Sequence, residues 1–203
     1  MKASDINSEY INHFNKIKLL NHIAESIAYF GVEQGFEKLM DNMDMTCGGI
    51  PEGDYCQVID LSAQEVFLSL YTNIAEYRFA YAVTNVLKMN EKFIIPVKDF
   101  LRRTGSELNV GEIPSLQEAY KVLYSIILDD LPSENSKEII SENQKEFLWK
   151  GTNKRHEDAW SKAGGKIENY LELLKDFADG LFSRSKIQLN FENDQIFMLH
   201  FIN

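Results

Sequence analysis

The chain has 203 residues, 44% of them apolar, with 13 Phe, 9 Tyr and 2 Trp and a formal net charge of −10. This length and this supply of bulky side chains suit one folded domain and exclude a disordered chain. The charge is spread evenly, since residues 1–105 carry 10 basic and 14 acidic groups and residues 106–203 carry 11 and 17. Phosphates would be repelled, so we expect no direct nucleic-acid binding and no membrane partner.

Targeting features and cysteine usage indicate the cytoplasm. No apolar run approaches the roughly 20 residues that span a bilayer, and the first residues contain no apolar signal core. Cys47 and Cys56 are too few for a disulfide scaffold and are not spaced like zinc-binding pairs. We therefore expect a cytoplasmic protein with reduced thiols, no metal and no cofactor.

Apolar residues recur at steps of three and four along most of the chain, which predicts helices. In chain order, the expected helices cover about residues 5–30, 32–43, 62–90, 96–105, 116–130, 134–149 and 156–182. Residues 45–60 are rich in Gly and Pro and are predicted to form a loop. Gly164 and Gly165 interrupt the last helix, which must kink there or meet another backbone closely.

Two of these helices begin at apparent capping boxes, Ser62 to Glu65 and Ser115 to Glu118. The helix that follows Ser62 is apolar on nearly every side, with only Glu76 and Arg78 charged over a long stretch. A helix of this kind is buried, so we expect it at the centre of the bundle. Because Glu76 and Arg78 are two residues apart, they point to nearly opposite sides and need different partners.

Residues 186–203 differ from the rest of the chain. Apolar and polar residues alternate from Ile187 to Phe191, and residues 196–202 are rich in β-branched and aromatic side chains, a pattern typical of a hairpin. The expected fold is all-α (mainly α), a multi-helix bundle in one domain of residues 1–203 with a small C-terminal β-hairpin as an appendage. A free edge of this hairpin could join an oligomer.

Three motifs that would carry chemistry are incomplete. His156 and Glu157 begin a zinc-protease motif, but Trp160 stands where the second histidine should be. Gly164-Gly165-Lys166 lacks the upstream glycine and the following Ser or Thr of a phosphate loop. Cys47 lies in a loop, yet the sequence places no histidine beside it to act as a base.

Glu76 is the candidate catalytic residue, because a carboxylate among aromatic side chains can serve as an acid or a base. A structural carboxylate, satisfied by a tyrosine or an arginine, explains the same pattern. One functional hypothesis is therefore an enzyme with a site around Glu76 and the loop of residues 45–56. Another is a helical subunit of a larger assembly.

The densest excess of charge lies between residues 129 and 146, where six acids face two lysines. The acids are Asp129, Asp130, Glu134, Glu138, Glu142 and Glu146. On a helix the four glutamates would form one acidic stripe, either a solvated face or a binding surface. Our leading hypothesis is a protein that acts by stoichiometric binding of a basic protein partner, such as an inhibitor or immunity-type protein that covers a nucleic-acid-processing enzyme.

Overall fold

A computed structural model describes residues 8–59, 61–134, 137–151, 153–192 and 195–202. Its helices are α1 (Ser8–Glu33), α2 (Leu39–Cys47), α3 (Tyr55–Val58), α4 (Gln64–Met89), α5 (Ile94–Glu107), α6 (Leu116–Ile126), α7 (Lys154–Ala163) and α8 (Ile167–Leu181). Two short 3-10 turns, η2 (Leu61–Ala63) and η3 (Glu91–Phe93), precede α4 and α5. The strands are β1 (Glu138–Glu142), β2 (Glu146–Lys150), β3 (Ile187–Phe191) and β4 (Ile196–Phe201). The chain is therefore mainly α, as predicted.

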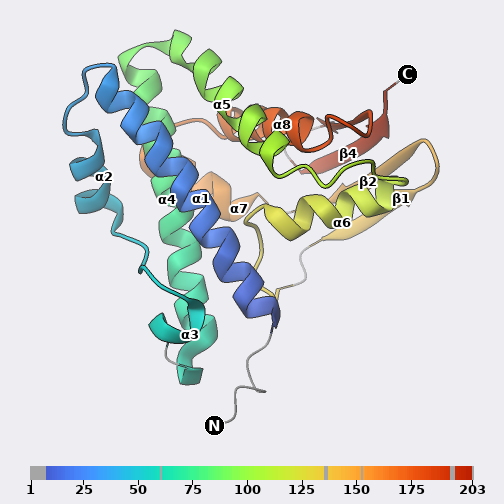
Figure 1. Cartoon of the computed structure of the whole chain (residues 1–203), viewed down its shortest axis with the longest axis horizontal. Helices are drawn as coiled ribbons and strands as arrows, with labels where there is room; N and C mark the ends of the chain where they lie inside the picture. The colour runs from blue at the N-terminus through green and yellow to red at the C-terminus, as the bar shows by residue number, and fades with distance from the viewer. Residues whose placement is uncertain (1–7, 60, 135–136, 152, 193–194, 203) are drawn as a thin grey trace.

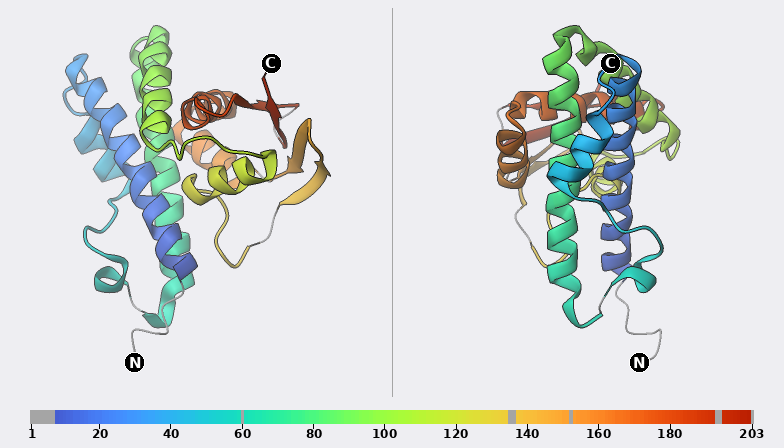
Figure 2. Two further views of the ribbon diagram at one scale, coloured as in Figure 1. Left: turned by 45° about the vertical axis from the view of Figure 1, so that its right-hand side comes forward. Right: turned by 90° about the vertical axis from the view of Figure 1, so that its left-hand side faces the viewer.

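The long helices α1 and α4 lie side by side in one half of the molecule, and α2 packs against both (Figure 1). Helices α5, α6 and α8 and the sheet make up the other half (Figure 2). Helix α4 contacts α1, α2 and α7, and its buried residues concentrate between Thr72 and Val86. Val66 and Leu70 near its start are exposed, so the prediction of a helix buried on every side is confirmed only for its later turns. Helices α5 and α8 approach closely because Gly105 and Gly180 face each other's helix, where a Cβ would overlap backbone atoms.

The expected C-terminal hairpin is confirmed, and it belongs to a larger antiparallel sheet. Strand β4 pairs with β3 on one side and with β2 on the other, which gives the order β1-β2-β4-β3. Trp149 of β2 stacks on Phe197 of β4 with ring centroids 5.4 Å apart, and Leu189 and Leu199 are buried in the same core. Because β2 and β3 enclose β4, the edges of this sheet are β1 and β3.

The predicted surface helix over residues 134–149 was wrong, because residues 138–150 form the strand pair β1–β2. Asn143 makes the turn, where its Oδ1 accepts hydrogen bonds from the backbone amides of Lys145 at 2.8 Å and Glu146 at 3.1 Å. Phe147 and Trp149 are buried and alternate with less buried neighbours, the period of a strand. The turn formed by Asn143 outweighs a weak helical spacing.

Only one of the two expected capping boxes marks a helix start. Ser115 caps α6, since its Oγ accepts a hydrogen bond from the Glu118 amide at 3.2 Å. Ser62 lies within η2, and Ala63 occupies the N-cap position of α4. The 3-10 turn therefore moves the start of α4 two residues beyond the predicted position.

Glycines end helices only where the backbone adopts a positive φ. Helix α1 continues through Gly31, and the chain turns at Gly35, whose φ is 104°. Gly164, with φ of 69°, caps α7 and separates it from α8. Within the described residues, no helix combines the length and the apolar character that crossing a membrane requires.

Candidate functional site

Three of the six acidic residues expected to bind a partner are held in ion pairs within the molecule. The ammonium of Lys137 lies 3.0 Å from Asp129 and 2.9 Å from Asp130. The guanidinium of Arg155 lies 3.2 Å from Glu134. Two cations of the same chain thus offset most of the charge of these three carboxylates.

The other three glutamates lie on the β1–β2 hairpin. Glu138 and Glu142, at the two ends of β1, are exposed and form no ion pair among the described residues. Glu146 begins β2, is half-buried, and accepts a hydrogen bond from Ser141 at 3.4 Å. The acidic helical stripe that motivated this site is replaced by two free carboxylates on one strand.

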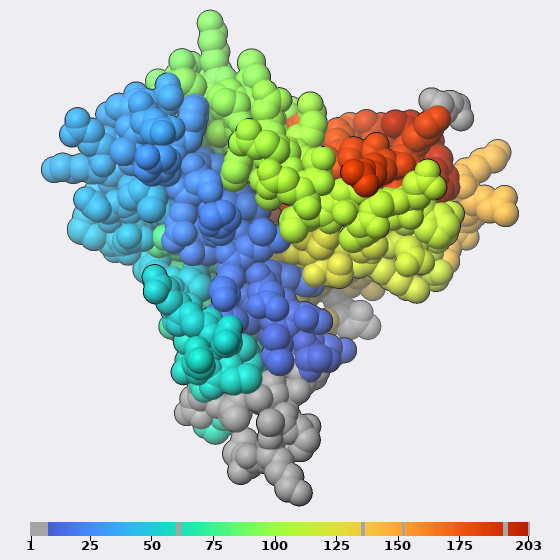
Figure 3. Space-filling model, viewed as in Figure 1, coloured from blue at the N-terminus to red at the C-terminus, as the bar shows by residue number. Residues whose placement is uncertain are grey.

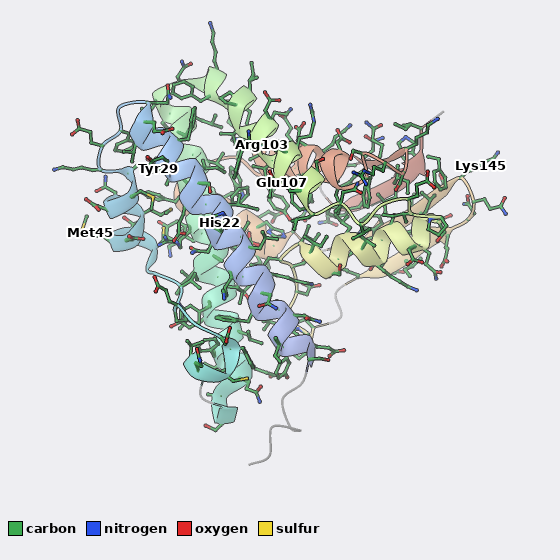
Figure 4. The ribbon with its side chains drawn as sticks, viewed as in Figure 1. His22, Tyr29, Met45, Arg103, Glu107 and Lys145 are labelled. Atoms are coloured by element: carbon green, nitrogen blue, oxygen red, sulfur yellow. The ribbon has the colours of Figure 1, made fainter. Side chains whose placement is uncertain are left out.

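Strand β1 is an edge strand with an apolar centre. Its hydrogen-bonded neighbour in the described sheet is β2, and Ile139 and Ile140 are 53% and 50% exposed. The pairing register shifts between Ile139 and Ser141, which is a β-bulge at Ile140. The hairpin projects at the side of the molecule (Figure 3), and Lys145 points outward from its turn (Figure 4).

A second cluster of functional groups surrounds Glu76 in the core. Its carboxylate is 1% exposed, and Nδ1 of His156 donates a hydrogen bond to Oε2 over 2.9 Å. Nε2 of the same imidazole lies 3.0 Å from the Tyr170 hydroxyl, and the two rings stack with centroids 4.1 Å apart. Helices α4, α7 and α8 thus each supply one member of a hydrogen-bonded row.

The electrostatics of this row are set by burial and by the carboxylate. Burial disfavours the charged imidazolium of His156, but the charge and hydrogen bond of Glu76 outweigh burial and raise the pKa of His156. Burial raises the pKa of the Tyr170 phenol well above its usual value. Tyr170 is therefore a hydrogen-bonding phenol and not an ionised nucleophile.

Asp129, from the acidic segment, lies close to this buried row. Burial raises the pKa of Asp129, although Lys137 opposes the shift. Asp129 lines a cavity of about 10 Å³ together with His156 and Tyr170, enough space for about one water molecule. Glu76 and Asp129, which sequence reasoning had assigned to different sites, thus both lie near His156.

A larger cavity of about 60 Å³ lies against Glu76 itself. Most of its lining is apolar and comes from α1, α4, α5, α8 and the end of α6. Glu76 and Tyr170 provide polar groups in its wall, and Lys16 contributes a third. The ammonium of Lys16 donates to the backbone carbonyl of Tyr124.

The loop of residues 45–56 does not join this cluster. Arg78, not Glu76, reaches the loop, where its guanidinium donates to the Gly48 carbonyl at 2.6 Å, and it also contacts Asp44 of α2 at 2.6 Å. Glu76 and Arg78 therefore have different partners, as predicted. Burial raises the pKa of Cys47 to about 11, so this thiol is a poor nucleophile.

Sequence reasoning missed His156 and Tyr170. His156, Ala159, Trp160 and Ala163 are the buried residues of α7, and their spacing of three and four could have indicated that the imidazole faces the core. No sequence signal identified Glu76 as its partner, since 80 residues separate them. Within the described residues, no group of three or more His, Cys, Asp or Glu side chains could hold a metal ion.

Comparison of the chain with protein-family models, with curated proteins and with solved structures finds no match.

Proposed function

We propose that this protein acts by stoichiometric binding of a basic protein segment, which adds to the sheet as an extended strand beside β1. The observation that carries the proposal is an edge strand with two half-exposed isoleucines between two unpaired glutamates. The backbone of an edge strand supplies hydrogen bonds, and its side chains supply specificity. This replaces the predicted helical surface with a strand that keeps two of the same glutamates.

The charges on β1 favour a basic segment over a second copy of the chain. In an antiparallel pair of two β1 strands centred on Ile140, Glu138 of one copy would face Glu142 of the other. Like charges directly opposite each other destabilise a sheet, and charged residues on edge strands limit such self-association. Lysines or arginines at the same positions of a partner would instead form opposite-charge pairs.

Binding of a short basic peptide tests the proposal. The probe is a fluorescent peptide of alternating Lys and Val, and its binding is followed by fluorescence anisotropy at low and high salt. Glu138→Lys combined with Glu142→Lys should weaken binding about tenfold at low salt. The control combines Glu37→Lys with Glu107→Lys, which makes the same change of charge at two exposed positions outside β1.

A second peptide separates strand pairing from general attraction between opposite charges. It replaces two of the valines with proline, which cannot donate the hydrogen bonds of a strand. We expect the proline peptide to bind much more weakly than the Lys-Val peptide. Equal binding of the two peptides, or equal weakening by the two double variants, would overturn the proposal.

A further inference from the structure

An open hollow lies at the turn end of the β1–β2 hairpin, beside the edge strand. Its volume is about 530 Å³, within the range of small-molecule sites in proteins. One wall comes from the start of α6 and the residue before it, and the other comes from Glu142, the turn of the hairpin and the end of β4. A segment that pairs with β1 along its whole length therefore reaches Glu142 at the rim of this hollow.

The charge of the hollow comes from one side chain. Among the described residues that line it, only Glu142 is charged, and this carboxylate is exposed and forms no ion pair within the described part of the chain. Lys145 points outward from the turn and is not part of the wall (Figure 4). The N-terminus of α6 favours anions, but Ser115 already caps it and its partial charge is only about half that of a carboxylate. The hollow therefore favours a cation.

The uncharged groups of the wall suit a guanidinium better than an ammonium. The ring of Phe201 is 41% exposed and offers an aromatic surface on which a flat guanidinium can stack. The exposed side chains of Gln117 and Gln144 carry amide oxygens that can accept its N–H groups. An arginine presents its donors in one plane, whereas those of a lysine surround a single nitrogen.

We propose that this hollow binds an arginine side chain of the basic partner, in the residues that follow the segment paired with β1. The guanidinium lies between the carboxylate of Glu142 and the ring of Phe201. The inference rests on the proposed strand pairing for its partner, but the hollow can be tested without that pairing. It makes an arginine, and not positive charge alone, the feature that this end of the surface recognises.

The first test uses the unaltered protein and a probe too small to pair with β1. N-acetyl-arginine amide and N-acetyl-citrulline amide have nearly the same shape, but only the arginine is charged. Each is titrated into isotope-labelled protein, and the side-chain amide signals of Gln117 and Gln144 are followed by NMR. We expect saturable shifts with the arginine amide and about tenfold weaker binding of the citrulline amide, because citrulline forms neither an ion pair nor a cation–π contact.

The second test asks whether the hollow and β1 bind the same segment. The Lys-Val peptide is extended by a Gly-Gly linker that ends in arginine or in citrulline. The extension is placed at the amino end in one pair of peptides and at the carboxyl end in another, because a strand can pair with β1 in either direction. We expect arginine to strengthen binding about tenfold over citrulline at one end of the peptide and to have little effect at the other.

A matched pair of variants locates the arginine. Gln117→Lys puts a positive charge into the wall without altering β1, and Gln34→Lys makes the same change at an exposed position outside both sites. The preference for arginine over citrulline should be lost in Gln117→Lys and kept in Gln34→Lys. Glu142 is not varied in this test, because it belongs to both sites.

Failure of the hollow and failure of the strand pairing give different results. If the Lys-Val peptide does not bind but the arginine amide still shifts Gln117 and Gln144, the strand pairing fails and the hollow remains an arginine site. If arginine and citrulline bind equally, as amides or as peptide extensions at both ends, the arginine proposal is overturned. An arginine preference that survives equally in both glutamine variants would overturn it as well.

Discussion

Two buried histidines lie against the same helix and have opposite electrostatic properties. Nε2 of His13, on α1, lies 2.8 Å from the Thr72 hydroxyl of α4, and His156, on α7, contacts Glu76 one turn further along α4. Burial and the nearby Lys16 lower the pKa of His13 to about 4. Burial also opposes the charged form of His156, but the carboxylate of Glu76, aided by that of Asp129, outweighs it and raises the pKa of His156.

The difference shows that burial keeps an imidazole neutral unless a nearby carboxylate outweighs it, as Glu76 does for His156 and the Thr72 hydroxyl cannot for His13. A hydroxyl can hydrogen-bond to a neutral histidine but offers no charge to stabilise its protonated form. A carboxylate stabilises the protonated form directly. One turn of helix thus separates a position that favours a neutral histidine from one that favours a charged histidine.

The largest expected loss of stability comes from removing the Glu76 carboxylate, which distinguishes the surroundings of His156 from those of His13. Glu76→Ala should lower the free energy of unfolding by about 3 to 5 kcal/mol, because it leaves one member of a buried pair without its partner. Urea unfolding at pH 7 measures the change. Asn73→Ala, at an exposed position on the same helix, is the control and should cost less than about 0.5 kcal/mol. Equal losses in the free energy of unfolding for Glu76→Ala and Asn73→Ala would show that the pairing of Glu76 with His156 does not stabilise the fold.

Acid should destabilise the protein through His13. Its folded-state pKa of about 4 lies below the ordinary value of 6.5, so its contribution is complete above pH 6.5 and is lost as the pH falls towards 4. The loss amounts to roughly 3 kcal/mol over this range. Unfolding of the wild type and of His13→Gln between pH 7 and pH 4 measures it. As the pH falls, we expect the stability of the wild type to fall relative to that of His13→Gln. If the stabilities of the two proteins fall in parallel with pH, the pKa of His13 is not lowered in the folded state.

His156 should show the opposite dependence on pH. Its folded-state pKa is raised, so its contribution is complete below pH 6.5 and is lost as the pH rises through the folded-state pKa. Relative to His156→Gln, the wild type should therefore lose stability as the pH increases from 6 to 9. In Glu76→Gln, the NMR titration of His156 should move to lower pH, towards the behaviour of His13. An unchanged titration would show that Glu76 is not the cause.

Removing the neutral partner should cost less than removing the charged one. Thr72→Val keeps the shape of the side chain but deprives His13 of its hydrogen bond. We expect a loss of about 1 to 3 kcal/mol in urea unfolding, the cost of one unsatisfied buried polar group. A loss as large as that of Glu76→Ala would remove the distinction between a neutral and a charged partner.

The smallest effect on stability is expected on the surface of β1. Glu138 and Glu142 have no ion-pair partner among the described residues, so the double change to lysine should alter the free energy of unfolding by no more than about 0.5 kcal/mol. Thermal unfolding measures this change. A strong destabilisation would mean that these glutamates serve the fold and are not available to a partner.

The sequence predicted the elements whose signals are local. Helix α4 was predicted because nearly every position is apolar, and the pair β3–β4 was predicted because its apolar residues alternate. The region of β1 and β2 was misread, since glutamates four residues apart share a face both on a helix and on a regular strand. The turn at Asn143 was the local signal that could have separated these alternatives.

The candidate site was less predictable because its contacts are not local. Glu76 was singled out by its charge on an apolar helix, but its pairing with His156 depends on how α7 packs across α4. Likewise, Asp129 and Asp130 were identified as part of an acidic surface, whereas both form ion pairs with Lys137 of the same chain. A sequence shows which charges are unusual, but the tertiary packing decides which of them meet.

The order of the sheet also determines when the fold can be completed. Strand β2 pairs with β4, and their pairing places Glu146 opposite His200, so two helices must be made between the two strands. Until then, Phe147 and Trp149 can pack against Tyr120 of α6 but lack Leu199 and Phe197, their partners on β4. Closing so long a segment of chain is slow, and a strand without its hydrogen-bonded neighbour is prone to aggregate. We therefore expect the sheet to form late in folding, and the nascent chain to be most prone to aggregate between the synthesis of β2 and that of β4.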